Sequence, residues 1–125
     1  MSIESHRDLL VWQLAMRLAA DVATIATGLP VHERYGLASQ LRRAATSIPL
    51  NIAEGWARPT RVHINHLSIA LGSEAELKTQ LDLAVTMKLI AITDAEPLLA
   101  TAGQVGRMLR GLVKSLRAHL LRSQP

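Results

Sequence analysis

Two histidines have the spacing at which neighbouring imidazoles can bind one metal ion. His63 and His66 are three residues apart, so on a helix they would lie on one face. A metal site needs further ligands, yet the chain has no cysteine, and Asn65 and Ser68 are poor donors. The Glu-x-x-His pairs of di-iron bundles are also missing. We therefore expect partly buried or interface histidines without a metal or other cofactor, and a metal-dependent bundle enzyme is the less favoured alternative.

The sequence contains no arrangement of residues that predicts catalysis. It has no Gly-x-Ser-x-Gly motif, no phosphate-binding Walker loop and no Gly-x-Gly-x-x-Gly fingerprint. Glu74 and Glu76 are two residues apart and would diverge on a helix, so they do not form an acid–base pair. We expect a protein that is not an enzyme.

Cations are concentrated near the end of the chain. The net charge of the chain is +4. Residues 97–125 contain five Lys and Arg and no acid, so the charges of residues 1–96 add up to −1. Four of these cations step by three and four residues and would line one side of a helix: Arg107, Arg110, Lys114 and Arg117. Such a row can contact phosphates, so we predict nucleic-acid binding. The alternative is a solvated outer face, or a set of ion pairs with a neighbouring subunit.

Arg42 and Arg43 are a second group of candidate nucleic-acid-binding cations. Adjacent helical residues point about 100° apart, so at most one of the two can face the core. We expect that one to form an ion pair with Glu54, Glu74 or Glu76.

The elements that must position these side chains are helical. Hydrophobic residues make up 49% of the chain but aromatic residues only 2%, and an aliphatic core suits helix packing better than a sheet. Apolar residues recur at helical spacing over residues 5–27, 31–55, 59–88 and 94–121. The second segment contains Pro49, where we expect a kink. In the fourth segment Thr93 and Glu96 have capping-box spacing.

The apolar stripes predict which faces are buried. In the first segment we expect a stripe of Leu9, Trp12, Met16, Ala19 and Ala23, and in the fourth a heptad seam of Leu98, Ala102, Val105, Leu109, Leu112 and Leu116. At Gly72, in the third segment, we expect close approach of another helix. Together these patterns predict an all-α, antiparallel up-down-up-down four-helix bundle in one domain, residues 1–125.

Three features of the composition bear on location and assembly. The chain has no cysteine, no signal-like start and no apolar run approaching the roughly 18 residues that span a bilayer, so we expect a cytoplasmic protein without a membrane partner. Its mean hydropathy of +0.18 is high for a lone bundle of this size. That value favours burial of apolar surface between copies.

Three stretches of the sequence carry a family resemblance. They are Leu10–Ala15, the long segment from Glu33 to Gly55, and Ile69–Ser73 with Glu76–Leu81. They resemble the four-helix-bundle family of 23S rRNA intervening-sequence proteins, and are similar to the accessory variability proteins of diversity-generating retroelements. The matching positions are Arg42, Arg43, Pro49, Asn51, Glu54, Gly55, Gly72, Ser73, Glu76 and Gln80.

The resemblance implies a ring-like homopentamer with a positively charged surface. In the retroelement relatives that surface is tied to nucleic acid and to the reverse transcriptase, so RNA, DNA and a protein partner are all expected. A purely structural assembly module is the alternative. Most of the matching positions would be architectural, and Asn51, Glu54 and Ser73 would need hydrogen-bond partners between the second and third helices.

Overall fold

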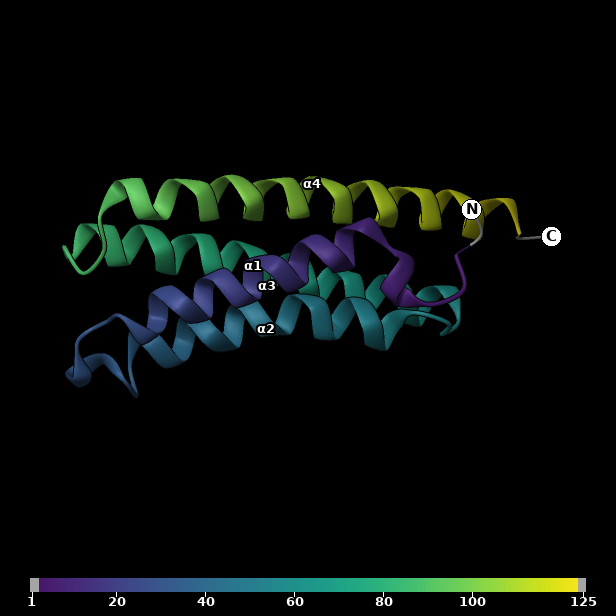
Figure 1. Cartoon of the computed structure of the whole chain (residues 1–125). Helices are drawn as coiled ribbons and strands as arrows, with labels where there is room; N and C mark the ends of the chain where they lie inside the picture. The colour runs from purple at the N-terminus through teal and green to yellow at the C-terminus, as the bar shows by residue number, and fades with distance from the viewer. Residues whose placement is uncertain (1–2, 124–125) are drawn as a thin grey trace.

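The computed structural model describes residues 3–123, and within them it is all helical (Figure 1). The elements, in order, are η1 (His6–Asp8), α1 (Leu10–Thr27), η2 (Val31–Glu33), α2 (Leu37–Gly55), α3 (Thr60–Thr86) and α4 (Ile92–Arg122). The four long helices run alternately in opposite directions. This confirms the all-α four-helix fold. No helix of the described chain is both long and apolar enough to cross a bilayer.

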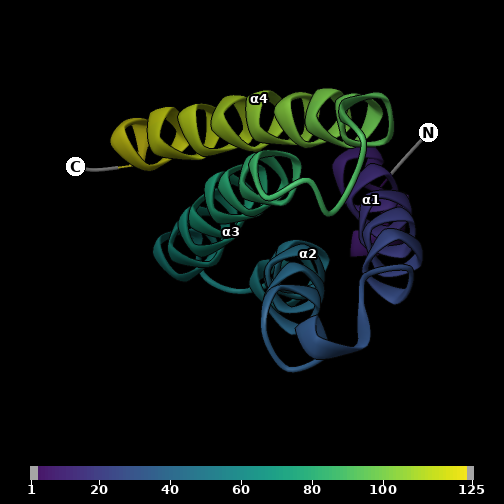
Figure 2. The ribbon, with the colours of Figure 1, turned by 90° about the vertical axis from the view of Figure 1, so that its left-hand side faces the viewer.

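Each helix packs against the one that follows it in the chain. The α1–α2, α2–α3 and α3–α4 contacts are extensive, the α1–α4 contact is smaller, and α2 does not touch α4. Figure 2 shows the same order, because α4 runs across the top of the view next to α3 and α1, whereas α2 lies on the opposite side of the bundle. The core consists of aliphatic side chains, of which Leu18, Leu41, Ile52, Leu67 and Leu81 are fully buried. Burying one such side chain stabilises the fold by about 1.5–3 kcal/mol.

The first helix begins later and is rotated relative to the prediction. The 3-10 helix η1 comes before α1, and Ser5 and Asp8 form a reciprocal capping box there. In α1 the buried line includes Val11, Ala15, Leu18 and Val22, whereas Met16 is 45% exposed. The predicted stripe was therefore right at Ala19 and wrong at Met16, because Val11 and Leu18 lie on a second apolar line of similar strength in this segment.

The second helix is shorter than predicted. It begins at Leu37 rather than Val31, because Gly36 has a non-helical backbone and the Glu33 carboxylate accepts a hydrogen bond from the Leu37 amide at 3.2 Å. Pro49 lies inside α2 and is buried. Thr46 donates its hydroxyl to the carbonyls of Arg42 and Arg43 rather than to the carbonyl that the proline leaves free. The kink at Pro49 stays a prediction.

The fourth helix begins at Ile92, so the predicted capping box at Thr93 and Glu96 does not form. The amides of Asp94 and Ala95 both donate to the carbonyl of Ala91, which places Thr93 inside the first turn. The seam holds through Leu98, Ala102, Val105 and Leu109. Beyond Leu109 the buried residue is Val113, while Leu112 and Leu116 are half-buried and pack against the core.

Candidate nucleic-acid interface and polar groove

The predicted cationic row lies on the outer face of α4. Its four members, Arg107, Arg110, Lys114 and Arg117, are all exposed. They span ten residues, which is roughly 15 Å at 1.5 Å per residue. Among the residues that the structure describes, none of the four forms an ion pair with a carboxylate. We call this set the basic row, and its charges are free to meet an external anion.

The C-terminal end of α4 extends beyond the rest of the bundle. Figure 1 shows it running past the α2–α3 connection, and no residue from 114 to 123 is buried. A hollow of about 400 Å³ lies between this end and the start of α3. Its lining is both apolar and basic: Arg61, Ile64, Arg117, Leu120 and Leu121. The exposed end therefore combines positive charge with uncovered apolar surface.

The other two candidate arginines lie on different faces from the basic row. Arg42 is half-buried, and its Nη2 donates to Thr27 Oγ1 on α1 at 2.9 Å. Arg43 points into a groove between α2 and α3. The expected ion pair of either arginine with Glu54, Glu74 or Glu76 was wrong, because Arg42 bonds to a hydroxyl and Arg43 is in none of the ion pairs of the described residues. Within one molecule, these two arginines are therefore not on the same surface as the basic row.

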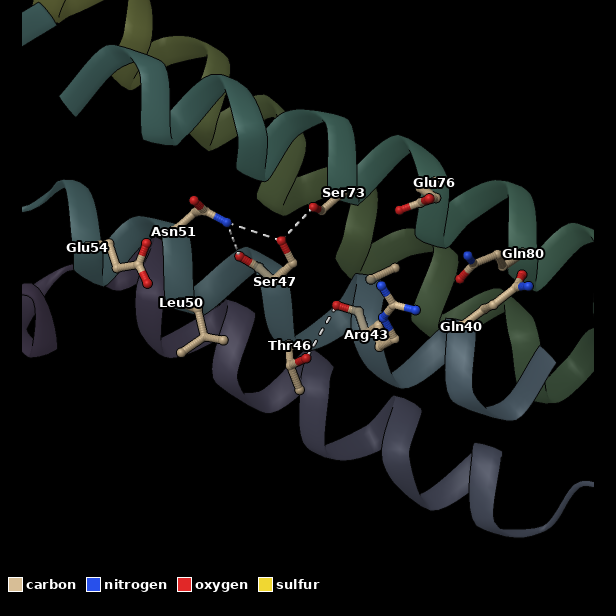
Figure 3. Close-up of a pocket in the computed structure, with 11 residues that line it drawn as sticks. Gln40, Arg43, Thr46, Ser47, Leu50, Asn51, Glu54, Ser73, Glu76 and Gln80 are labelled. Atoms are coloured by element: carbon tan, nitrogen blue, oxygen red, sulfur yellow. Dashed lines mark hydrogen bonds between the residues drawn. The ribbon is translucent and has the colours of Figure 1, made fainter. Parts of the chain in front are cut away.

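A groove lies between α2 and α3 (Figure 3). Its volume is about 660 Å³, and it is open to solvent. It is lined by Gln40, Arg43, Ala44, Thr46, Ser47, Leu50, Asn51, Glu54, Ser73, Glu76 and Gln80. Besides Arg43, five of these residues are among the positions that carry the family resemblance: Asn51, Glu54, Ser73, Glu76 and Gln80. We call this the α2–α3 groove.

A chain of hydrogen bonds follows the floor of the α2–α3 groove. The Ser73 hydroxyl donates to Ser47 Oγ at 2.8 Å, and Asn51 Nδ2 donates to Ser47 Oγ at 3.1 Å and to the Ser47 carbonyl at 2.9 Å (Figure 3). Asn51 Oδ1 lies 3.1 Å from Nδ1 of His66, which is also 3.7 Å from Glu54 Oε2. The hydrogen-bond partners expected for Asn51 and Ser73 are therefore present, whereas Glu54 is exposed and only approaches His66. Gln80 differs, because it is 9% exposed and no residue of the described range 3–123 donates a hydrogen bond to its Oε1.

The two histidines pack against the end of α2. A Cβ at Gly55 would lie 2.9 Å from His66 Cβ and 3.0 Å from His63 Cδ2, so the glycine permits this contact. His63 is buried, its Nε2 is unpaired, and its ring meets Trp56 edge-on at 6.3 Å. Burial, with a smaller effect of His66, lowers the pKa of His63 below its ordinary value. The described residues contain no cluster of three potential metal ligands.

Sequence reasoning missed the contact between Glu74 and Gly106. Glu74 is 2% exposed, and its Oε2 lies 2.9 Å from Lys78 Nζ, although outside hydrogen-bond geometry. A Cβ at Gly106 would lie 2.8 Å from the Glu74 carboxyl carbon, so α4 can pack here only without a side chain. In contrast, a Cβ at Gly72 would meet nothing within 4 Å. The predicted close approach of a helix at Gly72 was wrong within this chain.

Comparison with known proteins agrees with this architecture. A crystal structure of a protein with unknown function from the S23 ribosomal protein family of Bacteroides thetaiotaomicron superposes with a TM-score of 0.78. The two sequences are 23% identical, and the match covers 84% of this chain and 96% of the other, so the likeness establishes a shared fold. No curated protein sequence matches this chain. The profile of the 23S rRNA-intervening sequence protein family matches residues 7–111, and the chain therefore belongs to that family.

Proposed function

We propose that this protein is a non-enzymatic homo-oligomer, a pentamer by its resemblance, that binds nucleic acid through the basic row of α4. The observation that carries the proposal is the exposure of four cations on one helix face with no carboxylate paired to them among the described residues. Arginine and lysine side chains that line one face of a helix can neutralise several phosphates. The counterions that the nucleic acid then releases supply most of the affinity. Such contacts position a backbone without reading bases, so binding is largely independent of sequence.

Arg42 and Arg43 do not belong to this proposed site. The hydrogen bond to Thr27 fixes Arg42 against α1, and Arg43 shares its groove with the carboxylates of Glu54 and Glu76. One cation beside two carboxylates gives the groove a net negative lining, which repels a polyanion.

The proposal is tested by charge reversal of the basic row. We expect fluorescence anisotropy to detect binding of labelled RNA and DNA duplexes at about 50 mM salt and marked weakening by about 200 mM. Changing Arg107, Arg110, Lys114 and Arg117 to Glu abolishes this binding. The control reverses four other exposed cations, Arg7, Arg17, Arg34 and Arg58, and alters the net charge equally while retaining binding. Equal losses in both variants, or no binding by the wild type, would reject the proposal.

A second candidate function is a purely structural assembly module, accessory to a protein partner such as a reverse transcriptase. The observation that favours it is the exposure of large apolar side chains on all four helices, including Leu10, Leu50, Leu83 and Leu121. Surfaces of this kind are typical of association between proteins. Light scattering on the same charge-reversed variants separates the two functions. Loss of assembly without any effect on nucleic-acid binding favours the assembly module.

A further inference from the structure

The α2–α3 groove and the protruding end of α4 carry opposite charges. Glu54 and Glu76 outnumber Arg43 in the groove, whereas the end of α4 carries Lys114 and Arg117 without any acid. Helix α3 separates the two surfaces, and α2 makes no contact with α4 within the described chain. A single molecule therefore cannot bring these complementary surfaces together.

The groove also contains an unmet hydrogen-bond acceptor. Gln80 is more than nine-tenths buried, it lines the groove, and its Oε1 has no donor within the described structure. An unpaired buried amide oxygen costs about 1–3 kcal/mol, so the groove favours an occupant that supplies an N–H donor. Lysine and arginine side chains carry three and five such donors.

The walls and floor of the groove have the form that accepts a helix. Gln40, Arg43, Ser47, Leu50 and Glu54 step by three and four residues along α2, so they form one continuous wall. Ala44, Ser47 and Ser73, which also line the groove, have small side chains. Small residues let the backbone of another helix approach closely.

We propose that the α2–α3 groove of one molecule binds the C-terminal end of α4 from a second molecule of this protein. The inference rests on the homo-oligomer of the proposed function and names the two surfaces that form it. Lys114 and Arg117 meet the carboxylates of Glu54 and Glu76. Leu121, 70% exposed at the end of the same row, and Leu50, 58% exposed on the groove wall, supply apolar contact. Because the two surfaces differ, the contact is head-to-tail and repeats around a ring or along a filament.

The test is a charge exchange between the two surfaces, with the mass measured by sedimentation velocity. Variant G carries Glu54→Arg and Glu76→Arg, and variant H carries Lys114→Glu and Arg117→Glu. We expect each alone to raise the dissociation constant at least about tenfold, because like charges then face each other in the contact. Combining all four changes in one chain restores the wild-type mass, because the two surfaces are then complementary again with their charges exchanged.

The controls are reversals of exposed charges on other faces, Asp82→Arg on α3 and Arg17→Glu on α1, which leave the mass unchanged. Circular dichroism verifies that each variant is folded. Leu121→Asp provides a test independent of the four exchanged charges, since this side chain is 70% exposed and lies outside the core, and it also lowers the mass. A monomeric wild type, single variants of wild-type mass, or a charge exchange that fails to restore association would each overturn the proposal.

Nucleic-acid titration of variant G distinguishes this proposal from the nucleic-acid function. Variant G retains the whole basic row, and loss of the contact frees Lys114 and Arg117, so its salt dependence per chain is at least as steep as that of the wild type even though its mass is lower. A wild type that assembles through these surfaces but binds no nucleic acid would support the interface and reject the binding function. The reverse result, binding without any effect of variants G and H on mass, would reject the interface alone.

Discussion

At the residue scale, Gly106 sets the distance between α3 and α4. It faces the buried carboxylate of Glu74, where a Cβ would come within 2.8–2.9 Å of three carboxyl atoms. Glu74 cannot turn away without losing its contact with Lys78. The glycine is thus required by packing and not by its backbone freedom, since its φ is not positive.

We therefore expect Gly106→Ala to lower the free energy of unfolding by about 1–3 kcal/mol, as in other overpacked interiors. The matched control is Gly111→Ala, five residues later in the same helix, where a Cβ meets nothing within 4 Å. That change removes a helix-weakening glycine and raises stability by about 0.5–1 kcal/mol. Urea unfolding of both variants measures the difference. Similar effects of the two changes would mean that Glu74 does not fix the spacing.

The burial of His63 has a consequence for stability against pH. Its pKa is lowered in the folded protein, chiefly by desolvation, whereas in the unfolded chain it is near the ordinary value of 6.5. Below that value the unfolded chain binds a proton that the folded chain resists. The contribution of neutral His63 is therefore present above about pH 6.5 and is lost as the pH falls through the folded-state pKa.

We expect the urea midpoint of the wild type to fall between about pH 7.5 and 5.5, around the ordinary histidine pKa. His63→Gln keeps a polar side chain but cannot take up the proton, so its midpoint falls less over the same interval. His32→Gln is the control, because His32 is exposed and its replacement leaves the pH dependence as in the wild type. An equally steep fall for His63→Gln would contradict this assignment.

At the scale of elements, polar contacts determine how α2 and α3 are aligned. Asn51 is the centre of that contact, since its Nδ2 donates to Ser47 and its Oδ1 accepts from His66 in the tautomer that carries a proton on Nδ1. The pair Ser47 and Ser73 extends the same connection across the two helices. A continuous network of this kind favours one register between two otherwise aliphatic helices.

We expect Asn51→Ala to destabilise the protein by about 1–3 kcal/mol, because His66 and Ser47 then lose a partner in a partly buried site. Asn65→Ala on the exposed side of α3 serves as the matched control, with a change within about 0.5 kcal/mol. Thermal unfolding followed by circular dichroism compares the two. A cost for Asn51→Ala no larger than the control would show that aliphatic packing alone aligns the helices.

The sequence predicted the existence of the four helices better than their beginnings. The spacing of apolar residues identified all four, because burial of an apolar face is a property of many residues together. The starts depend on single contacts such as Glu33 with the Leu37 amide, or the Ala91 carbonyl with the amides of α4. Several residues near each start could have served as caps, and periodicity does not choose among them.

At the scale of the whole molecule, the order of helix packing decides which charges act together. The spacing along α4 was sufficient to predict the basic row, because all its members belong to one helix. Arg42 and Arg43 could not be placed in this way. Their surroundings depend on α1 and α3 packing on either side of α2, which no local pattern encodes. The contact of Glu74 with Gly106 was missed for the same reason.

The most direct test of the central claim is the salt dependence of duplex binding in variants that each lose one cation of the basic row. Each phosphate contact on B-DNA contributes about −0.9 to the slope of log K against log salt. Arg110→Gln should therefore make the slope less steep by about 0.9, and Arg43→Gln should leave it unchanged. An unchanged slope for Arg110→Gln, or an equal change for Arg43→Gln, would show that the basic row of α4 is not the surface that meets phosphate.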